Sequence, residues 1–277
     1  MRLGAHLSIG RGLDAMARVA VDLECETVQV FSRSPRGGRP RPLAEDERDG
    51  MRRRLDAAGI TPLIVHVPYF VNLASPDEHI REYSEETVAL DRERARILGA
   101  DYVVTHPGSY GREGTQAEGV ARVGAGIRRL LAAGGPGPKL LLEQTAGGRG
   151  QLGGTLRELR VMLDESGAEG ICLDTAHAYA AGYDLSGAGW EDFLAEVAGE
   201  VGIDRVKVLH LNDTAEELGG HRDRHVRVGE GRLGESTFRR ILHDRRLQGL
   251  PGVLEAPRAS DSDLRGQIAT LRRLRMD

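Results

Sequence analysis

Short apolar runs alternate with longer amphipathic segments along the whole chain. Each run is a continuous block of mainly β-branched and aliphatic residues, which is typical of strands covered on both faces. The runs cover residues 2–6, 27–31, 61–66, 101–106, 139–143, 170–174, 206–211 and 251–255. The segments between them repeat their apolar positions with helical periodicity. These predicted helices cover 11–23, 45–58, 76–98, 115–133, 155–166, 189–200, 235–246 and 260–275.

One predicted helix carries clear signals at both ends. Ser75 is expected to be its N-cap, with Pro76 at the first helical position and Glu78 completing a capping box. Gly99 is expected to end it. Strands that alternate strictly with helices in this way predict an α/β fold, a single (β/α)₈ TIM barrel spanning residues 1–277.

The composition is that of an ordinary globular protein, with 277 residues and a formal net charge of −4. The charge argues against a generic nucleic-acid binder, although bound divalent cations would offset several of the acids. Cys25 and Cys172 lie far apart, which favours a reducing compartment. We find neither a signal-peptide core nor an apolar run of membrane-spanning length, so a cytoplasmic protein is expected. The glycine-rich segment 147–154 lacks the Gly-Lys-Ser/Thr ending of a P-loop and is expected to be a flexible loop at the barrel mouth.

Metal-ligand side chains recur where the predicted strands end. Six consecutive strands carry such a residue at the carboxyl edge, where TIM-barrel enzymes build their sites. These residues are His66, His106, Glu143, Asp174, His210 and Glu255. Loops add His177, Asp223 and His225, and the last two are spaced to point the same way on an extended segment.

Each of these residues alone has an ordinary explanation, for example a carboxylate that caps the next helix. Together, the set would be a costly cluster of buried charge without metal. Mixed imidazole and carboxylate ligation suits Zn²⁺, with Mn²⁺ or Fe²⁺ possible. Nine ligands suffice for three ions if one carboxylate bridges. His6 is expected to point toward the rim with a weaker claim as a ligand, Cys172 to be an apolar filler of the barrel, and His79, His221 and His243 to be solvated.

Seven motifs in a fixed order resemble the endonuclease IV family, zinc-dependent apurinic/apyrimidinic (AP) endonucleases of base-excision repair. The resemblance spans the chain, from GAHLS at 4–8 to LEAP at 254–257. Its most specific parts are DTAHAYAAGYD and DRHVRVGEGRLG. The other motifs are VHVPYFVNLAS, VVTHPGSYG, LLEQTAGGRGQLG, LHLNDT and LEAP.

The resemblance implies a trinuclear zinc site and divides the ligands among its ions. His66, His106 and Glu143 would hold one zinc ion. Glu143 would bridge to a second, completed by Asp174, His210 and Glu255, and the third would take His177, Asp223 and His225. Glu143, Asp174 and Glu255 would carry the catalytic roles.

The implied reaction is hydrolysis of the phosphodiester 5′ to an abasic site in duplex DNA. A hydroxide between two ions would attack the phosphate, leaving a 3′-hydroxyl and a 5′-deoxyribose phosphate. A 3′-phosphodiesterase activity on blocked ends, a nucleoid-associated location and a monomeric state are further expectations.

DNA recognition would depend on shape, with the duplex bent and the abasic nucleotide flipped out. The inserted side chains would be Arg36, Tyr69 and Phe70. The segment FSRSPRGGRP departs from the family pattern, which usually has Lys, Asn and Trp in this loop. Arg33 could replace the Lys contact to phosphate, and the paired glycines predict a more mobile loop.

Two other readings remain open. A xylose isomerase-like sugar isomerase or epimerase would need fewer ligands and usually a Lys or second Glu for proton transfer. A non-catalytic DNA-lesion-binding barrel would have lost at least one ligand.

Overall fold

Eight parallel strands close into a barrel in the computed structural model, which describes residues 1–255 and 260–277. Around the barrel the strand order is β1-β10-β7-β6-β5-β4-β3-β2, so each strand lies beside its neighbours in the chain. The predicted TIM barrel is therefore confirmed. The strands are β1 Arg2–Leu7, β2 Thr27–Phe31, β3 Leu63–His66, β4 Tyr102–Thr105, β5 Lys139–Glu143, β6 Gly170–Asp174, β7 Val206–His210 and β10 Pro251–Leu254.

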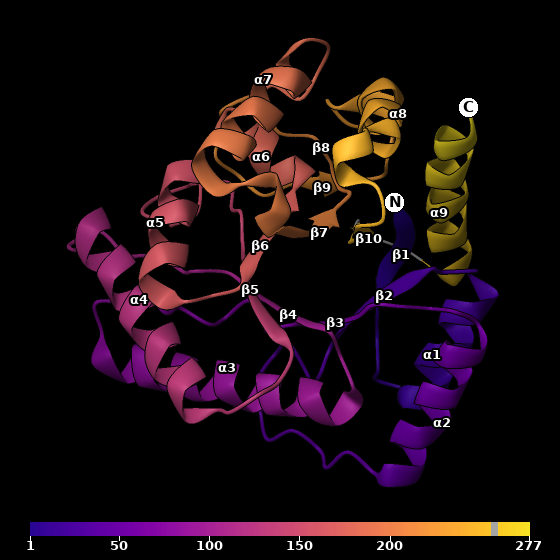
Figure 1. Cartoon of the computed structure of the whole chain (residues 1–277), viewed down its shortest axis with the longest axis horizontal. Helices are drawn as coiled ribbons and strands as arrows, with labels where there is room; N and C mark the ends of the chain where they lie inside the picture. Colours follow the sequence, from indigo (N-terminus) through magenta and orange to yellow (C-terminus); the bar gives the residue numbers. More distant parts are fainter. Residues whose placement is uncertain (256–259) are drawn as a thin grey trace.

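Helices surround the barrel (Figure 1). They are α1 Leu13–Asp22, α2 Glu45–Ala57, α3 Glu78–Leu98, α4 Gln116–Ala133, α5 Leu156–Ser166, α6 Thr175–Ala181, α7 Gly189–Glu196, α8 Gly234–His243 and α9 Asp261–Met276. The short helix α6 was not predicted. The helix expected over 189–200 ends at Glu196 and continues as a π-helical turn, Val197–Val201. No helix in the described part of the chain combines the length and the apolarity that a membrane crossing requires.

The predicted N-cap of α3 is wrong. The N-cap is Asp77, whose side chain accepts a hydrogen bond from the backbone N–H of Ile80 at 3.2 Å. Ser75 instead accepts from the N–H of Asp77, so the two residues form a local turn ahead of the helix. An Asp is as good an N-cap as a Ser, and sequence alone did not decide between them. The predicted end is confirmed, because Gly99 adopts the left-handed conformation with φ of 70°.

The barrel interior is a compact apolar plug, distinct from the larger core between strands and helices. The plug consists of Ile64, Val104, Leu141, Cys172, Val208 and Val253, all fully buried. The prediction that Cys172 fills space in the barrel is confirmed. Each plug residue precedes a predicted metal ligand by two positions. Residues two apart on a strand face the same way, so the plug forms a floor for the site.

Two loops at the carboxyl end of the barrel are held by hydrogen bonds. A small antiparallel pair, β8 Asp213–Thr214 and β9 His225–Val226, shapes the loop that carries Asp223. The loop 147–154 was expected to be flexible, but it is tied to its neighbour by Tyr110 N–H to Gly150 O at 3.0 Å and Leu152 N–H to Gly108 O at 2.9 Å. Two residues of the LEAP motif, Ala256 and Pro257, lie outside the described residues.

Candidate metal centre

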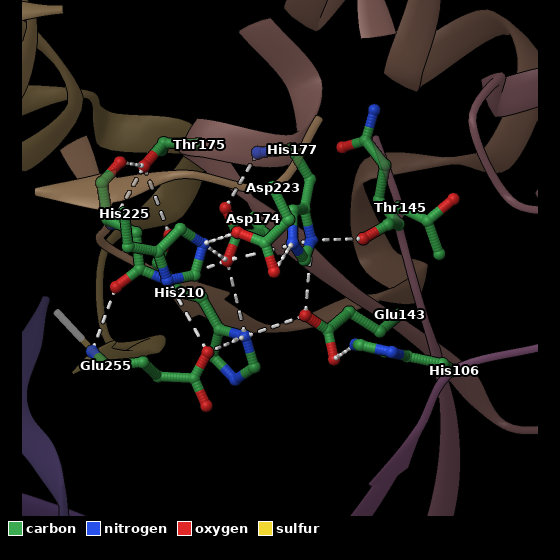
Figure 2. Close-up of polar contacts among 12 residues, drawn as sticks. His106, Glu143, Thr145, Asp174, Thr175, His177, His210, Asp223, His225 and Glu255 are labelled. Carbon is green, nitrogen blue, oxygen red and sulfur yellow. Dashed lines mark hydrogen bonds and ion pairs between the residues drawn. The ribbon is translucent and has the colours of Figure 1, made fainter. Parts of the chain in front are cut away.

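Glu143 lies at the middle of the strand-end cluster, with its two oxygens directed to different partners (Figure 2). Its Oε2 is 2.8 Å from Nε2 of His66 and 2.8 Å from Nε2 of His106. The donor atoms of these three residues all lie within 4.8 Å of one another, so they can hold one ion. This is the first of the three ligand sets that the resemblance implies.

The other oxygen of Glu143 belongs to a second group. Glu143 Oε1 is 3.1 Å from Nδ1 of His210, and the same nitrogen is 3.0 Å from Oε2 of Glu255. Asp174 completes this group, whose donor atoms again lie within 4.8 Å of one another. A carboxylate that shares its two oxygens in this way has the geometry of a bridging ligand.

The third group differs in one member from the predicted set. His177 and His225 come together with Asp174, which thus belongs to two groups. Asp223 lies beside the same imidazoles, with Oδ2 3.4 Å from His177 Nε2 and Oδ1 3.0 Å from His225 Nε2. Its side chain is 56% exposed, whereas that of Asp174 is fully buried. Asp223 therefore closes this group from the solvent side.

Asp174 also serves the local structure. It is the N-cap of α6, and its Oδ1 accepts a hydrogen bond from the N–H of His177 at 2.9 Å. The capping interaction leaves Oδ2 directed toward the imidazoles of His210 and His225, 3.7 and 3.8 Å away. Asp174 thus caps the helix with one oxygen and directs the other into the cluster. Helix capping and a place among the candidate ligands are therefore compatible for this residue.

The acids and imidazoles of the cluster stabilise each other's charged forms. Burial opposes ionisation of Glu143, but His106 and His210 outweigh it and hold the pKa of Glu143 well below its ordinary value. Burial opposes protonation of His177, but Asp174 and Asp223 outweigh it and hold the pKa of His177 well above its ordinary value. The pKa of His210 is raised well above its ordinary value in the same way, by Glu255 and Glu143 against burial.

The donor set fits divalent cations. Glu143, Asp174 and His210 are buried to 1% exposure or less, and such a concentration of ionisable groups is costly unless a cation offsets the acids. His225 Nε2 is buried and faces two acids, Asp223 Oδ1 at 3.0 Å and Asp174 Oδ2 at 3.8 Å, so it is directed into the third group. Imidazole nitrogens mixed with carboxylate oxygens are ligands of Zn²⁺, Mn²⁺ and Fe²⁺.

Two buried amides, Asn212 and Gln29, contact this cluster and were not predicted from the sequence. His6, which was given a weaker claim as a ligand, contacts it as well. Asn212 donates to Asp174 Oδ2 at 2.6 Å and accepts from the N–H of Glu255 at 2.9 Å. Gln29 contacts His210 and Glu255 from inside β2. His6 Nδ1 is 3.2 Å from Glu255 Oε1. The signal for Gln29 was available, because a lone amide in the apolar run TVQVF must find polar partners in the interior.

The other histidines lie apart from the three groups, as predicted. His79 is 97% exposed on α3. His221 and His243 are exposed and each faces a backbone carbonyl, that of Ala146 at 3.0 Å and that of Leu274 at 3.2 Å.

The three predicted DNA-contact residues differ in exposure. Tyr69 is 65% exposed and lines the same cleft as the ligands, and Arg36 is exposed on its loop. Phe70 is half-buried, with its ring stacked on Tyr83 at 5.9 Å and the Arg33 guanidinium carbon 5.7 Å from its centre. Phe70 is thus packed against protein on more than one side.

Arg33, the residue expected to contact phosphate, lines the cleft beside its loop with a side chain that is mostly buried. Its side chain is 5% exposed and pairs with Asp91, Nε to Oδ2 at 3.4 Å, while it donates to Thr87 Oγ1 at 3.2 Å. Because Asp91 is fully buried, the guanidinium is drawn inward to offset that carboxylate. Arg94 fixes both ends of the loop by donating to the carbonyls of Ser32 and Arg41.

Two adjoining clefts open at this end of the barrel. A cleft of about 390 Å³ is lined by the cluster and by Tyr69. A second cleft of about 610 Å³ is lined by Arg36, Arg39 and Arg41. His6 and Phe31 line both, so the cationic cleft continues directly into the acidic cluster.

Known proteins resemble this chain over its full length. The xylose isomerase-like TIM barrel family matches residues 17–275. The probable endonuclease 4 of Moorella thermoacetica is 39% identical, covering 99% of both chains. The probable endonuclease 4 of Methanoculleus marisnigri is 40% identical, covering 98% of both.

A solved structure agrees with these relatives. Endonuclease IV from Thermus thermophilus superposes with a TM-score of 0.87 at 36% identity, covering 99% of this chain and 100% of that one. A D-tagatose 3-epimerase-like protein superposes with a TM-score of 0.71 at 20% identity, a likeness of fold alone. The full-length identity to the endonucleases shows that this chain belongs to the endonuclease IV family.

Proposed function

We propose that this chain is a zinc-dependent AP endonuclease that hydrolyses the phosphodiester 5′ to an abasic site in duplex DNA. The products would be a 3′-hydroxyl and a 5′-deoxyribose phosphate, and blocked 3′ ends would be further substrates. The observation that carries the proposal is Glu143, whose two oxygens connect two adjacent groups of metal ligands.

Three ions are proposed on the nine residues predicted from the sequence. His66, His106 and Glu143 would hold the first ion, and Glu143, Asp174, His210 and Glu255 the second. His177, Asp223 and His225 would hold the third, with Asp174 adjoining it. Bound divalent ions supply acidified water as a nucleophile at neutral pH and offset the charge of a phosphodiester.

The chain's own residues divide the remaining work. The carboxylates Glu143, Asp174 and Glu255 lie at the strand ends, above the apolar plug, and would hold the ions in fixed positions for the reacting phosphate. The buried floor keeps bulk water out from below. Asp223, at the exposed side of the cluster, faces the direction from which DNA would approach.

DNA binding is proposed for the rim that surrounds this cleft. Arg36, with Arg39 and Arg41 beside it, offers guanidinium groups to backbone phosphates. Tyr69 is the exposed aromatic ring next to the ligands and would act as the wedge in the base stack. Phe70 would support that wedge from below instead of inserting fully, because Tyr83 and Arg33 already cover its ring.

The local net charge of this rim is what matters for DNA, since the whole-chain value of −4 includes the acids that metal ions would neutralise. Monomeric state and a cytoplasmic, nucleoid-associated location remain predictions.

The two competing functions predict different behaviour. A sugar isomerase or epimerase would have no use for a third ligand group at an exposed rim. A non-catalytic lesion binder would lack a ligand at one of the groups, yet every predicted ligand lies in or against its group.

The test is incubation of metal-loaded protein with a duplex that contains one tetrahydrofuran abasic analogue. This analogue cannot undergo β-elimination, so any nick is hydrolytic. We expect one nick, on the 5′ side, that leaves a 3′-hydroxyl and disappears on chelation. Protein that carries its full metal complement and makes no nick would overturn the proposal.

A further inference from the structure

Gln29 is a fully buried amide in the middle of an apolar strand. It lies on β2, in register with His6 of β1 on one side and with Ile64 of β3 on the other. Burying an amide without hydrogen-bond partners destabilises the fold, so the contacts of Gln29 must account for its presence. Those contacts are with His210 and Glu255 of the metal centre and with His6 beside them.

The two ends of the Gln29 amide face chemically different groups. Its Oε1 is 3.0 Å from Nε2 of His210, and its Nε2 is 2.5 Å from Oε1 of Glu255. A flipped amide would set its oxygen against the Glu255 carboxylate, where no proton is available. The orientation is therefore dictated by Glu255, and the carbonyl must accept a hydrogen bond from His210 Nε2–H.

This hydrogen bond determines which nitrogen of His210 is free. With one proton held on Nε2, Nδ1 is the nitrogen that can lose its proton and ligate an ion, on the side where Glu143 and Glu255 lie 3.1 and 3.0 Å away. The other candidate ligands face the cluster differently. His66 donates from Nδ1 toward Val67 O at 2.7 Å, and His177 Nδ1 is 2.9 Å from Gln144 O, which leaves Nε2 available in both.

The same amide fixes Glu255. Oε1 of Glu255 accepts from Gln29 and lies 3.2 Å from His6 Nδ1, while Oε2 faces His210 Nδ1. One carboxylate oxygen is thereby held by the barrel wall, and the other faces the second group of candidate ligands, where it would hold an ion. Glu255 directly follows the last strand, β10, where Asn212 accepts a hydrogen bond from its backbone N–H, and the contact with Gln29 fixes its side chain as well.

We propose that Gln29 is a positioning residue of the metal centre: its carbonyl sets the tautomer of His210 and its NH₂ group fixes the ligating oxygen of Glu255. This inference rests on the proposed metal-dependent function. It concerns the second ion, because His210 and Glu255 both belong to that group. Replacing a residue that hydrogen-bonds to metal ligands typically costs about 10- to 100-fold in metal affinity or activity.

The main test is Gln29→Met, with Gln29→Leu as a second variant of similar volume. Replacing a buried polar side chain by an apolar one of similar shape can be nearly neutral for folding. The matched control is Thr27→Val on the same strand, where a buried hydroxyl donates to Pro62 O at 2.7 Å, at the opposite end of the barrel from the metal centre. Each protein is stripped with chelator, its melting temperature is measured, and zinc is titrated against a chromophoric competitor.

We expect both Gln29 variants to bind one of the three zinc ions about 10- to 100-fold more weakly. At saturating zinc, kcat on the abasic duplex falls while KM for DNA is unchanged. Thr27→Val keeps the wild-type zinc affinities even if its melting temperature drops. Wild-type zinc affinities in a folded Gln29 variant would overturn the proposal.

A second measurement uses the unmodified protein and does not depend on a variant that folds. Nitrogen-15 NMR of zinc-loaded protein with labelled histidine should show one ring with a protonated Nε2 and a ligated Nδ1, assigned to His210 by its loss in His210→Asn. A His210 ring ligated through Nε2 would contradict the role of Gln29. Wild-type protein that binds no zinc would instead remove the metal centre itself, which separates failure of this inference from failure of the proposed function.

Discussion

At the scale of single residues, the cluster depends most on Glu143. It contacts His66 and His106 through one oxygen and His210 through the other. An amide keeps the shape of this side chain but offers only one acceptor and no negative charge. Among the described residues of the cluster, Glu143 alone joins these two groups through separate oxygens, so the effect of its replacement cannot be compensated locally.

Glu143→Gln should therefore abolish nicking of the tetrahydrofuran duplex, with a loss on the order of a thousandfold or more. The fold should persist, because the plug below Glu143 is unchanged. The control is Glu169→Gln, which removes a charge near the other end of the same strand, where Glu169 accepts from the N–H of Leu140 at 2.8 Å. It should keep full activity. A fully active Glu143→Gln protein would contradict the bridging role.

The raised pKa values in the cluster predict that metal binding releases protons. The pKa values of His177 and His210 lie well above the ordinary value, so both rings carry a proton at neutral pH in metal-free protein. Ligation requires their neutral forms, hence zinc must displace those protons. Calorimetric titration at pH 7 in buffers of different ionisation enthalpy should detect release of about one or more protons per chain.

The sign of the pH dependence follows from the same shifts. Lower pH stabilises the protonated rings and weakens zinc binding, and higher pH strengthens it. In metal-free protein the contribution of these imidazoles to stability is complete below the ordinary histidine pKa and is lost as pH rises through the raised values. A heat of binding that is independent of buffer would show that the rings are neutral before zinc arrives.

At the scale of elements, alternation along the strands explains why so much of the site was predictable. The residue two positions before each strand-end candidate ligand belongs to the plug. In the run LLLE, for example, Leu141 is part of the plug and Glu143 is the candidate ligand above it. The chemistry of a strand-end His or Glu is visible in one line of sequence. The six strand-end members of the cluster were predicted for this reason.

What sequence reasoning missed depends on contacts between distant segments. Asp77 and Ser75 are equally good N-caps on paper, and the choice was made by the turn that Ser75 forms. The pair of Arg33 with Asp91 was also not indicated by the sequence, because Asp91 lies far along the chain and is fully buried on α3. The sequence also did not show that Asp174 lies beside His225, because these residues come from a strand end and a distant loop that meet only in the folded chain.

The loop after β3 gives a prediction that distinguishes the proposed role of Tyr69 in DNA binding from that of Phe70 in packing. Tyr69 is 65% exposed, so Tyr69→Ala should weaken binding to an abasic duplex by about tenfold or more, on the basis of about 1–3 kcal/mol for a stacking aromatic, with little change in melting temperature. Phe70→Ala should mainly lower the free energy of unfolding, by about 1–2 kcal/mol, less than for a core Phe because the ring is half-buried. Fluorescence anisotropy and urea denaturation measure the two effects. The assignment fails if Phe70→Ala is as stable as wild type and binds DNA worse than Tyr69→Ala.

At the scale of the whole molecule, the cluster and the contacts that join the last helix to the first strand lie at opposite ends of the barrel. The carboxyl ends of the strands carry the cluster. At the amino ends, Arg275 of α9 donates to both oxygens of Glu26 at 2.6 and 2.9 Å and to the carbonyl of Met1 at 2.9 Å. Glu26 Oε2 in turn accepts from the N–H of Leu3 at 2.8 Å. The last helix thereby holds the first strand in the closed barrel, and Figure 1 shows α9 beside β1 and α1.

Arg275→Met tests this separation. At pH 7 it should lower the free energy of unfolding by about 1–2 kcal/mol, a modest figure because the pair is about one-third exposed. The kcat on abasic DNA should be unchanged, since no ligand is involved. Arg273→Met is the control on the same helix: its pair with Glu235 is nearly half exposed, so the free energy of unfolding should change little.

The effect of Arg275→Met should also depend on pH in a defined direction. Burial raises the pKa of Glu26, but Arg275 and the N–H of Leu3 outweigh it and hold that pKa below its ordinary value. A carboxyl with a lowered folded-state pKa contributes stability that is present above the unfolded value and lost as pH falls through the folded value. The difference between wild type and Arg275→Met should hence be full at pH 7 and shrink below about pH 4, where unfolded carboxyls become protonated. Urea denaturation at both pH values measures it, and a difference that stayed the same in acid would mean that Arg275 acts through packing of its stem instead of through Glu26.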